Sequence, residues 1–315
     1  MDGEVGMQEP TRRITAEEIE TYKRDGVVCL RGLLPAEWVA ELKKVMDKVE
    51  SDHAAKQKDG EFTLAASTDQ NSSQLHAMNN LGDLIEQAGG MVLKEKSGSK
   101  ADGAFILVNN GTRDYKDLRR IALESPLAEA AGALFETNKI NFLFDQIFIK
   151  QAGASTRTAF HQDQGYFRVD GQQCATFWTA CERVDMKNGA MGYVKGSHNW
   201  ETYAPNAFVS QMTMDTHGLP TLPDIEGNED DYDIVYYEVE PGDVIVHHYR
   251  TVHGARGNVS ANRGRRSAAI RFGGDDLTYL NRPSAPEEFP VDSNLNDGDP
   301  LDGDVFPVAW RVSLP

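Results

Sequence analysis

The sequence predicts a mainly β protein, with helices first and then an antiparallel β-sandwich or barrel. Five segments after residue 139 are rich in β-branched and aromatic residues, which is typical of strands. Glycine, proline and asparagine mark the gaps between them, and no helical pattern interrupts the series. The segments are INFLFDQIFIKQ, QQCATFWTACERV, DYDIVYYEVE, GDVIVHHYRTVH and RSAAIRF.

The first expected element is a helix that begins after Thr15. Thr15-Ala-Glu-Glu18 forms a capping box, and Gly26 is expected to end the helix. The apolar run VVCL (27–30) then predicts a short buried strand.

Two more helices are expected before the strands. Pro35 suits a first helical turn, and Ser125-Pro126 opens the segment PLAEAAGALFE. Apolar residues recur at helical spacing after Pro35, namely Trp38, Leu42, Val45 and Val49. Residues 50–104 are polar with weak periodicity, and we expect irregular structure there.

We therefore expect residues 1–315 to form a single domain. Its parts are a mostly helical and irregular N-terminal support (1–138), a β core (139–277) and a C-terminal tail packed on or near that core (278–315).

Composition narrows the class of partner and the compartment. The 49 acidic and 32 basic residues give a net charge of −17, which disfavours nucleic acid as a partner. We expect the acidic runs 224–233 and 292–304 to be solvated loops. Three cysteines without a CxxC pair, no visible secretory signal and no apolar run of membrane-spanning length predict a cytoplasmic protein that does not enter a membrane.

A candidate metal site lies in Phe160-His161-Gln162-Asp163. Side chains two apart on an extended segment point the same way, so His161 and Asp163 can reach one ion. His253, at the end of a later predicted strand, is the candidate third ligand. Two histidines and a carboxylate on one face of an ion are typical of Fe(II) enzymes that bind O₂ and a co-substrate. Zinc fits less well, because no cysteine has ligand spacing.

The remaining histidines lie outside this candidate ligand set. His247 and His248 are expected to be structural, with a role beside the metal as the alternative. His198 is expected to fix a turn, and no role is assigned to three others, His53, His76 and His217.

A keto-acid co-substrate such as 2-oxoglutarate would need a cation for its far carboxylate. A guanidinium suits that role because it offers two parallel hydrogen bonds and keeps its charge. Arg263, Arg265 and Arg266 follow His253 closely enough for a turn to return one of them to the metal. Strand alternation alone leaves open which one faces inward.

These motifs together resemble the phytanoyl-CoA dioxygenase family of Fe(II)/2-oxoglutarate oxygenases. The resemblance covers residues 14–50 and 139–277 and is carried by FHQDQGYF, CATFWTACERVDMKNGAMGYVKGSHNW, PGDVIVHHYRTVHG and RRSAAIRFGGDD. It implies a double-stranded β-helix, a cupin-like jelly-roll core, supported by helices.

The resemblance also implies the cofactors Fe(II), 2-oxoglutarate and O₂ and a set of site residues. By position, His161, Asp163 and His253 would bind the iron. Arg265 matches the 2-oxoglutarate arginine better than Arg266, which remains the alternative. Trp178 would pack beside the co-substrate, with an ordinary core tryptophan as the other interpretation.

The resemblance implies a dioxygenase that hydroxylates a small molecule with release of succinate and CO₂. Related halogenases carry a small residue where Asp163 stands, so hydroxylation is favoured over halogenation. Candidate pocket residues are Gln146, Lys150, Tyr166 and Phe167. The long polar segment 201–233 is a candidate lid and speaks against a long-chain lipid substrate.

Two alternative functions remain at this point. One is a cupin-like metal-dependent dioxygenase or isomerase without 2-oxoglutarate, which predicts no essential arginine in 263–266. The other is a non-catalytic jelly-roll binding protein.

Overall fold

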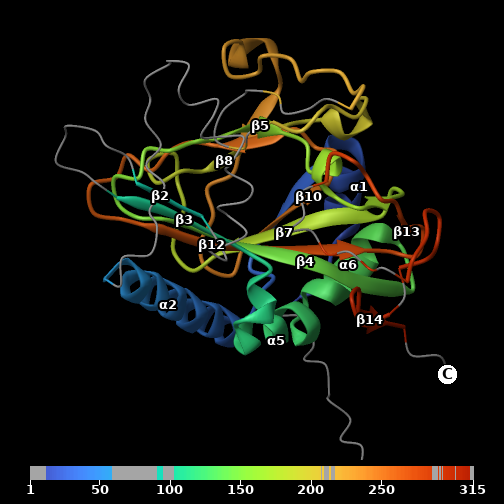
Figure 1. Ribbon diagram of the computed structural model, residues 1–315, viewed down its shortest axis with the longest axis horizontal. Coiled ribbons are helices and arrows are strands. Elements are labelled where there is room, and N and C mark those ends of the chain that lie inside the picture. Colours follow the sequence, from blue (N-terminus) through green and yellow to red (C-terminus); the bar gives the residue numbers. More distant parts are fainter. Residues whose placement is uncertain are drawn as a thin grey trace, which may run out of the picture.

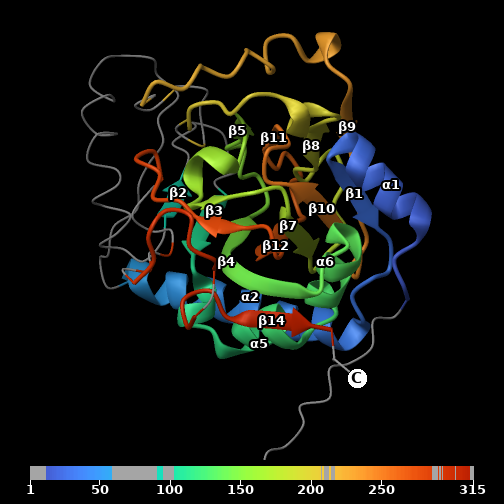
Figure 2. The same ribbon diagram turned by 90° about the vertical axis from the view of Figure 1, so that its right-hand side faces the viewer.

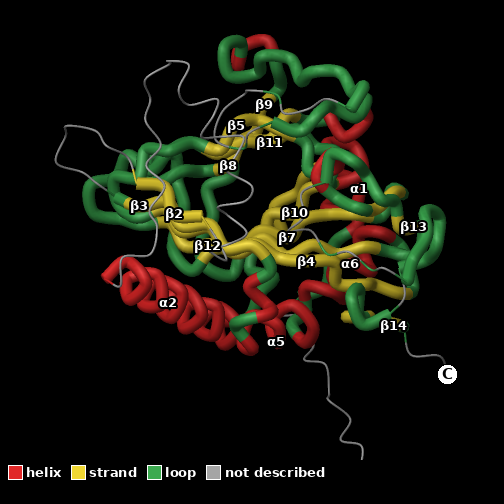
Figure 3. The backbone as a smooth tube through the Cα atoms, viewed as in Figure 1, coloured by secondary structure: helices red, strands yellow, loops and turns green. Residues whose placement is uncertain are grey.

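The computed structural model describes residues 12–58, 91–94, 103–206, 208, 213, 217–285, 290, 292, 294–301 and 303–312. In this part of the chain, two antiparallel sheets face each other, and helices cover the outer side of the larger sheet (Figures 1 and 3). The mainly β fold with a jelly-roll core is therefore confirmed.

The larger sheet has eight strands in the described ranges. Seven follow the order β1-β10-β7-β12-β4-β3-β2, and β14 pairs with β4. Their bounds are β1 Val27–Leu30, β2 Met91–Lys94, β3 Ala104–Asn109, β4 Lys139–Lys150, β7 Cys174–Ala180, β10 Val244–His248, β12 Arg265–Gly273 and β14 Val308–Arg311.

The smaller sheet follows the order β5-β11-β8-β9, and a separate pair joins β13 to β6. The bounds are β5 Thr158–His161, β6 Val169–Asp170, β8 Met191–Val194, β9 Ile234–Tyr236, β11 His253–Ala255 and β13 Thr278–Tyr279.

Among the described residues, four helices support the larger sheet. They are α1 Ala16–Asp25, α2 Ala36–Lys58, α5 Lys116–Glu124 and α6 Leu127–Phe135. The capping box at Thr15 and the left-handed Gly26 bound α1 as expected. The turned view shows α2 and α5 beneath the larger sheet and the smaller sheet above it (Figure 2).

Strand alternation divides the apolar residues of the larger sheet between two cores. Ile149, Phe177 and Ile270 belong to the cluster that contains the helices. Phe148 and Trp178 belong to the cluster that also contains residues of the smaller sheet. The face that carries Phe148 and Trp178 therefore lines the space between the two sheets.

The expectation of irregular structure for residues 50–104 was wrong at both ends. Helix α2 continues to Lys58, and β2 lies at Met91–Lys94. Lys43–Asp47 and Lys48–Asp52 ion pairs at i,i+4 spacing support the polar end of α2, where apolar periodicity fades. The rest of that prediction, at 59–90 and 95–102, lies outside the described residues, as does His76.

The C-terminal tail contributes to the large sheet. Its strand β14 pairs with β4, and Trp310 lies against α6, where a Cβ added at Gly132 would meet the indole ring at 2.4 Å. The chain therefore uses a glycine where this helix meets the tail.

The acidic run 224–233 has its carboxylates mostly at the surface. Asp224, Asp230, Asp231 and Asp233 are exposed, and Glu229 pairs with Arg256 at 2.8 Å. The three cysteines form no disulfide. Among the helices of the described ranges, none has the length and apolar character needed to cross a bilayer.

Candidate metal centre and its cavity

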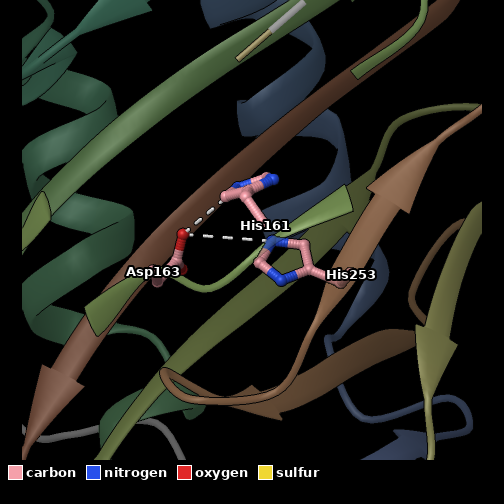
Figure 4. Close-up of side chains that lie close together, drawn as sticks. All are labelled: His161, Asp163 and His253. Atoms are coloured by element: carbon pink, nitrogen blue, oxygen red, sulfur yellow. Dashed lines mark ion pairs between the residues drawn. The ribbon is translucent and has the colours of Figure 1, made fainter. Parts of the chain in front are cut away.

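Three buried side chains meet between the two sheets: His161, Asp163 and His253. One ligand atom from each lies within 4.8 Å of the other two. Asp163 Oδ1 is 3.6 Å from His161 Nε2 and 3.9 Å from His253 Nε2. Figure 4 shows the carboxylate facing both imidazoles. The arrangement offers two nitrogen ligands and one oxygen ligand to a single ion.

The smaller sheet sets this geometry. His161 ends β5 and His253 begins β11, and the two residues are direct partners across the antiparallel pair. Asp163 is not on the strand, because its backbone has left the extended region (φ −71°, ψ −29°). The sequence argument expected an extended segment, but a turn after His161 brings the carboxylate to the imidazoles.

Backbone carbonyls select the same tautomer for both imidazoles. His161 Nδ1 lies 2.8 Å from the carbonyl oxygen of Ala159, and His253 Nδ1 lies 2.9 Å from that of Thr251. A carbonyl can only accept, so each Nδ1 carries a hydrogen, and in the neutral ring the lone pair is then on Nε2. Both lone pairs are therefore available to a metal, as is usual for metal-binding histidines.

Electrostatics favour the metal-binding forms of Asp163 and His253. Burial acts to raise the pKa of Asp163. Four nearby groups outweigh this effect and bring the pKa well below its usual value, namely His161, His247, His253 and Arg271. Burial lowers the pKa of His253 well below its usual value, and His247 and His161 add to this effect. A charged carboxylate and a neutral imidazole are the forms that bind metal.

The second carboxylate oxygen of Asp163 is held by the protein. Thr176 Oγ1 donates to Oδ2 at 2.8 Å. His247 Nε2 lies 3.6 Å from the same oxygen, and Arg271 Nη2 lies 3.9 Å from it. Oδ1 is thus the oxygen turned toward the two imidazoles.

The three side chains line a cavity between the sheets. The smaller sheet also contributes Met191 and Ala255 to the lining, and Phe208 comes from a loop. The larger sheet contributes residues that include Phe148, Trp178, His247, Arg265 and Arg271. Several buried polar atoms on this wall have no hydrogen-bond partner among the described residues: both ring nitrogens of His247 and the Nε atoms of Arg265 and Arg271. Such atoms fit a cavity that takes a polar ligand.

Arg265 and Arg266 point in opposite directions. Arg265 is 2% exposed and lines the cavity, where its Nη1 donates to the carbonyl of Gly189 at 2.6 Å. Burial lowers the pKa of Arg265 to about 10, so it stays charged at neutral pH. Arg266 instead forms ion pairs with Glu182 and Asp47 on the helix side.

The other predicted residues divide between the cavity and its surroundings. Trp178 and Gln146 line the cavity, and the Trp178 ring lies 5.6 Å from the Arg265 guanidinium carbon. Lys150 does not line it; its Nζ donates to the carbonyl of Arg256 at 3.0 Å.

Tyr166 and Phe167 also lie outside the cavity lining. The Tyr166 hydroxyl donates to the carbonyl of Asn206 at 2.8 Å, and its ring meets His161 edge-on. Phe167 packs edge-on against Phe144. Both side chains belong to a separate apolar cluster behind the metal ligands.

The two adjacent histidines of β10 face opposite sides. His247 lines the cavity, whereas His248 is held by the carbonyl of Gln172 at 2.8 Å. The candidate turn residue His198 lies 3.2 Å from the carbonyl of Lys23.

Sequence reasoning missed Arg271 and Thr176. Arg271 shares the parity of Arg265 on β12, so the alternation pattern contained a signal for it. Thr176 carried no such signal, because threonine is ordinary in a strand.

The chain is similar to known proteins of one family. The family model described as "Phytanoyl-CoA dioxygenase (PhyH)" matches residues 22–267. A zebrafish (Danio rerio) protein named "Phytanoyl-CoA dioxygenase domain-containing protein 1" is 24% identical over 267 residues, covering 78% of this chain and 86% of the relative. A Caenorhabditis elegans homologue of that protein is 23% identical, covering 76% and 85%.

Solved structures share the fold. The α-ketoglutarate-dependent carbocyclase SnoK from nogalamycin biosynthesis superposes with a TM-score of 0.64 at 20% identity, covering 94% of this chain and 96% of SnoK. The epimerase SnoN, in complex with Fe³⁺, α-ketoglutarate and nogalamycin RO, gives 0.60 at 22% identity, covering 93% and 97%. EctD from S. alaskensis, with 2-oxoglutarate and 5-hydroxyectoine, gives 0.60 at 18% identity, covering 99% and 92%.

Proposed function

Because this chain belongs to the phytanoyl-CoA dioxygenase family of Fe(II)/2-oxoglutarate-dependent enzymes, we propose that it hydroxylates a small molecule with release of succinate and CO₂. Membership of the family makes the chain an oxidoreductase whose cofactors are iron, 2-oxoglutarate and O₂.

One observation carries the proposal: two imidazole lone pairs, one ionised carboxylate and a buried guanidinium share a single cavity. His161, Asp163 and His253 would hold the iron from one side and leave its other positions for ligands. When bound there with 2-oxoglutarate, iron supplies the oxidation of a C–H bond by O₂, coupled to loss of CO₂ from the keto acid.

The protein residues around the ligands would set the geometry of the metal. The carbonyls of Ala159 and Thr251 fix the imidazole rings, and Thr176 holds the outer oxygen of Asp163. Preorganised ligands avoid the cost of reorientation when the metal binds.

Arg265 would bind the far carboxylate of 2-oxoglutarate. Its Nη1 is already bonded to Gly189, so the side-on pair Nε and Nη2 is the edge left for a carboxylate. Trp178 lies across the Arg265 guanidinium and would limit the movement of both partners. An inward arginine in 263–266 counts against the alternative enzyme that lacks 2-oxoglutarate.

Hydroxylation is the proposed outcome because Asp163 supplies a carboxylate where related halogenases have a small residue. The fold itself does not decide the product, since the structurally similar SnoN and SnoK are described as an epimerase and a carbocyclase. The fate of the substrate must therefore be measured.

The test begins with the visible spectrum of the protein, loaded anaerobically with Fe(II) and then with 2-oxoglutarate. We expect a weak metal-to-ligand charge-transfer band that His161→Ala abolishes. His217→Ala is the matched control, because His217 is exposed and lies outside the cavity lining. Iron binding without the band would favour the enzyme that lacks 2-oxoglutarate.

The product is then examined with isotopically labelled O₂. Hydroxylation predicts one labelled oxygen atom in the organic product and one in succinate. An unlabelled stereoisomer of the substrate would indicate epimerisation, and an unlabelled product that lacks two hydrogens would indicate ring closure or desaturation. Either result would contradict the proposed hydroxylation.

A further inference from the structure

A second buried guanidinium, that of Arg271, faces the same cavity as Arg265. Both residues lie on β12 and share its inner face, and Arg271 is 3% exposed. 2-Oxoglutarate has two carboxylates, and its keto-acid end belongs at the metal, so its other end can occupy only one of the two arginines. Arg271 is therefore left without an assigned ligand.

Arg271 is held in place mainly by neutral groups. Its Nη2 donates to Gln146 Oε1 at 2.6 Å and its Nη1 to the carbonyl of Ala269 at 3.1 Å. The guanidinium carbon lies 4.5 Å from the centre of the Phe144 ring and 5.7 Å from that of Phe167. Its Nε has no hydrogen-bond partner among the residues that the structure describes.

Two carboxylates lie near Arg271, and neither neutralises it fully. Asp163 Oδ2 is 3.9 Å away, beyond hydrogen-bond distance, and already accepts from Thr176. Asp145 precedes Gln146 on β4, so its side chain points to the opposite face of the sheet, where it accepts from the backbone N–H of Thr112.

The charges in the cavity favour one further anion. Two guanidiniums and a divalent metal face one carboxylate from the protein and a dianionic co-substrate. One positive charge remains unbalanced in a buried space, where an unpaired charge is costly. A single carboxylate on the substrate would balance it. Arg271 lines the cavity, and its Nε–H has no hydrogen-bond partner among the described residues.

We propose that Arg271, oriented by Gln146, binds a carboxylate group of the substrate, so that the enzyme acts on a small carboxylic acid. This inference rests on the proposed function and names its substrate class. The carboxylate would anchor the substrate beside the metal ligands and thereby select which carbon faces the metal.

The test uses the full chain, loaded anaerobically with Fe(II) and 2-oxoglutarate so that Arg265 is already occupied. Acetate is the probe, because it is a minimal carboxylate, and acetamide is its neutral counterpart. Sodium acetate replaces sodium chloride at constant ionic strength, and the visible band and the melting temperature are recorded. We expect acetate to shift both signals saturably and acetamide to shift neither.

Variants assign the response to Arg271. Arg271→Gln should weaken the binding of acetate by about tenfold or more, as expected for loss of a charge-assisted hydrogen bond. Arg119→Gln, an exposed arginine on α5, is the matched control and should leave the response unchanged. Gln146→Glu should also abolish the response, because it places a carboxylate of the protein against Arg271.

Several results would overturn the inference. These are a wild-type protein that shows the band but no response to acetate, an undiminished response in Arg271→Gln, and loss of the band on adding acetate, which would mean that acetate displaces 2-oxoglutarate. Loss of iron affinity in Arg271→Gln would also overturn it, since Arg271 would then act by positioning Asp163. If Arg271→Gln fails to fold, Gln146→Glu decides.

Failure of the underlying function gives a different result. A wild-type protein that binds iron but shows no band with 2-oxoglutarate would contradict the proposed function and this inference together. A normal band without a response to acetate would contradict the inference alone.

Discussion

Replacing Arg265 provides the most direct test of the co-substrate site. The guanidinium is 2% exposed, and its Nη1 is bonded to Gly189, so a carboxylate would meet it through Nε and Nη2. Two charge-assisted hydrogen bonds contribute about 3 kcal/mol together at the low end of their range. Arg265→Ala should therefore raise the Kd for 2-oxoglutarate roughly 100-fold.

Two further variants separate charge from geometry. Arg265→Lys keeps the charge but loses the planar fork, so we expect an intermediate increase of about tenfold in Kd. Arg266→Ala also removes an arginine side chain, but one that pairs with Glu182 and Asp47 on the other face of the sheet. It should leave the Kd within about twofold of the wild-type value, because it touches nothing in the cavity.

The assay is an anaerobic titration of the Fe(II)-loaded protein with 2-oxoglutarate, followed by the charge-transfer band. Iron content and circular dichroism are measured for each variant, so that loss of metal or of fold is not mistaken for weak binding. An unchanged Kd in Arg265→Ala, or an equal increase in Arg266→Ala, would refute the assignment of Arg265.

Three other predictions concern the metal, the pH dependence and the tail. Asp163→Ala should abolish iron binding, measured by equilibrium dialysis, with circular dichroism unchanged; retained binding would remove Asp163 from the ligand set. Burial lowers the pKa of His248 to about 3. Below the ordinary pKa of histidine, His248 therefore takes up a proton in the unfolded chain but not in the native state. The contribution of His248 to stability is thus complete above about pH 6.5 and should fall by about 2 kcal/mol by pH 5, measured by urea unfolding of the apoprotein. A similar slope in His248→Gln would contradict this. Gly132→Ala should reduce the free energy of unfolding by about 1–3 kcal/mol, because its Cβ would meet Trp310 at 2.4 Å. If Gly132→Ala costs less stability in a Trp310→Leu protein than in the wild type, the contact is supported. Equal costs in the two proteins would contradict it.

The alternation of side chains along β4 predicted which residues share a face, but not which of them reach the cavity. It placed Phe144, Gln146 and Phe148 on one face of β4. Gln146 and Phe148 line the cavity, whereas Phe144 packs in the separate cluster with Tyr166 and Phe167. It placed Lys150 on that face too, yet this side chain is drawn to the carbonyl of Arg256 instead of the cavity. A period of two fixes which residues share a face but cannot fix how far each side chain reaches.

The sequence by itself determined the local elements and the order of the chemical groups. The capping box at Thr15, the strand-like segments and the succession of His161, Asp163 and His253 are visible without any structure, because they depend on neighbouring residues or on residue type. The family resemblance followed from the same motifs.

Only the tertiary structure decided which side chains meet. Arg265 and Arg266 are adjacent, and either was consistent with alternation; pairing of β12 with β4 and β7 turns Arg265 toward the smaller sheet. The same pairing brings Arg271 beside Asp163, a contact across 108 residues of chain. Such contacts depend on strand register and on the side from which the second sheet packs, and neither is encoded in a local pattern.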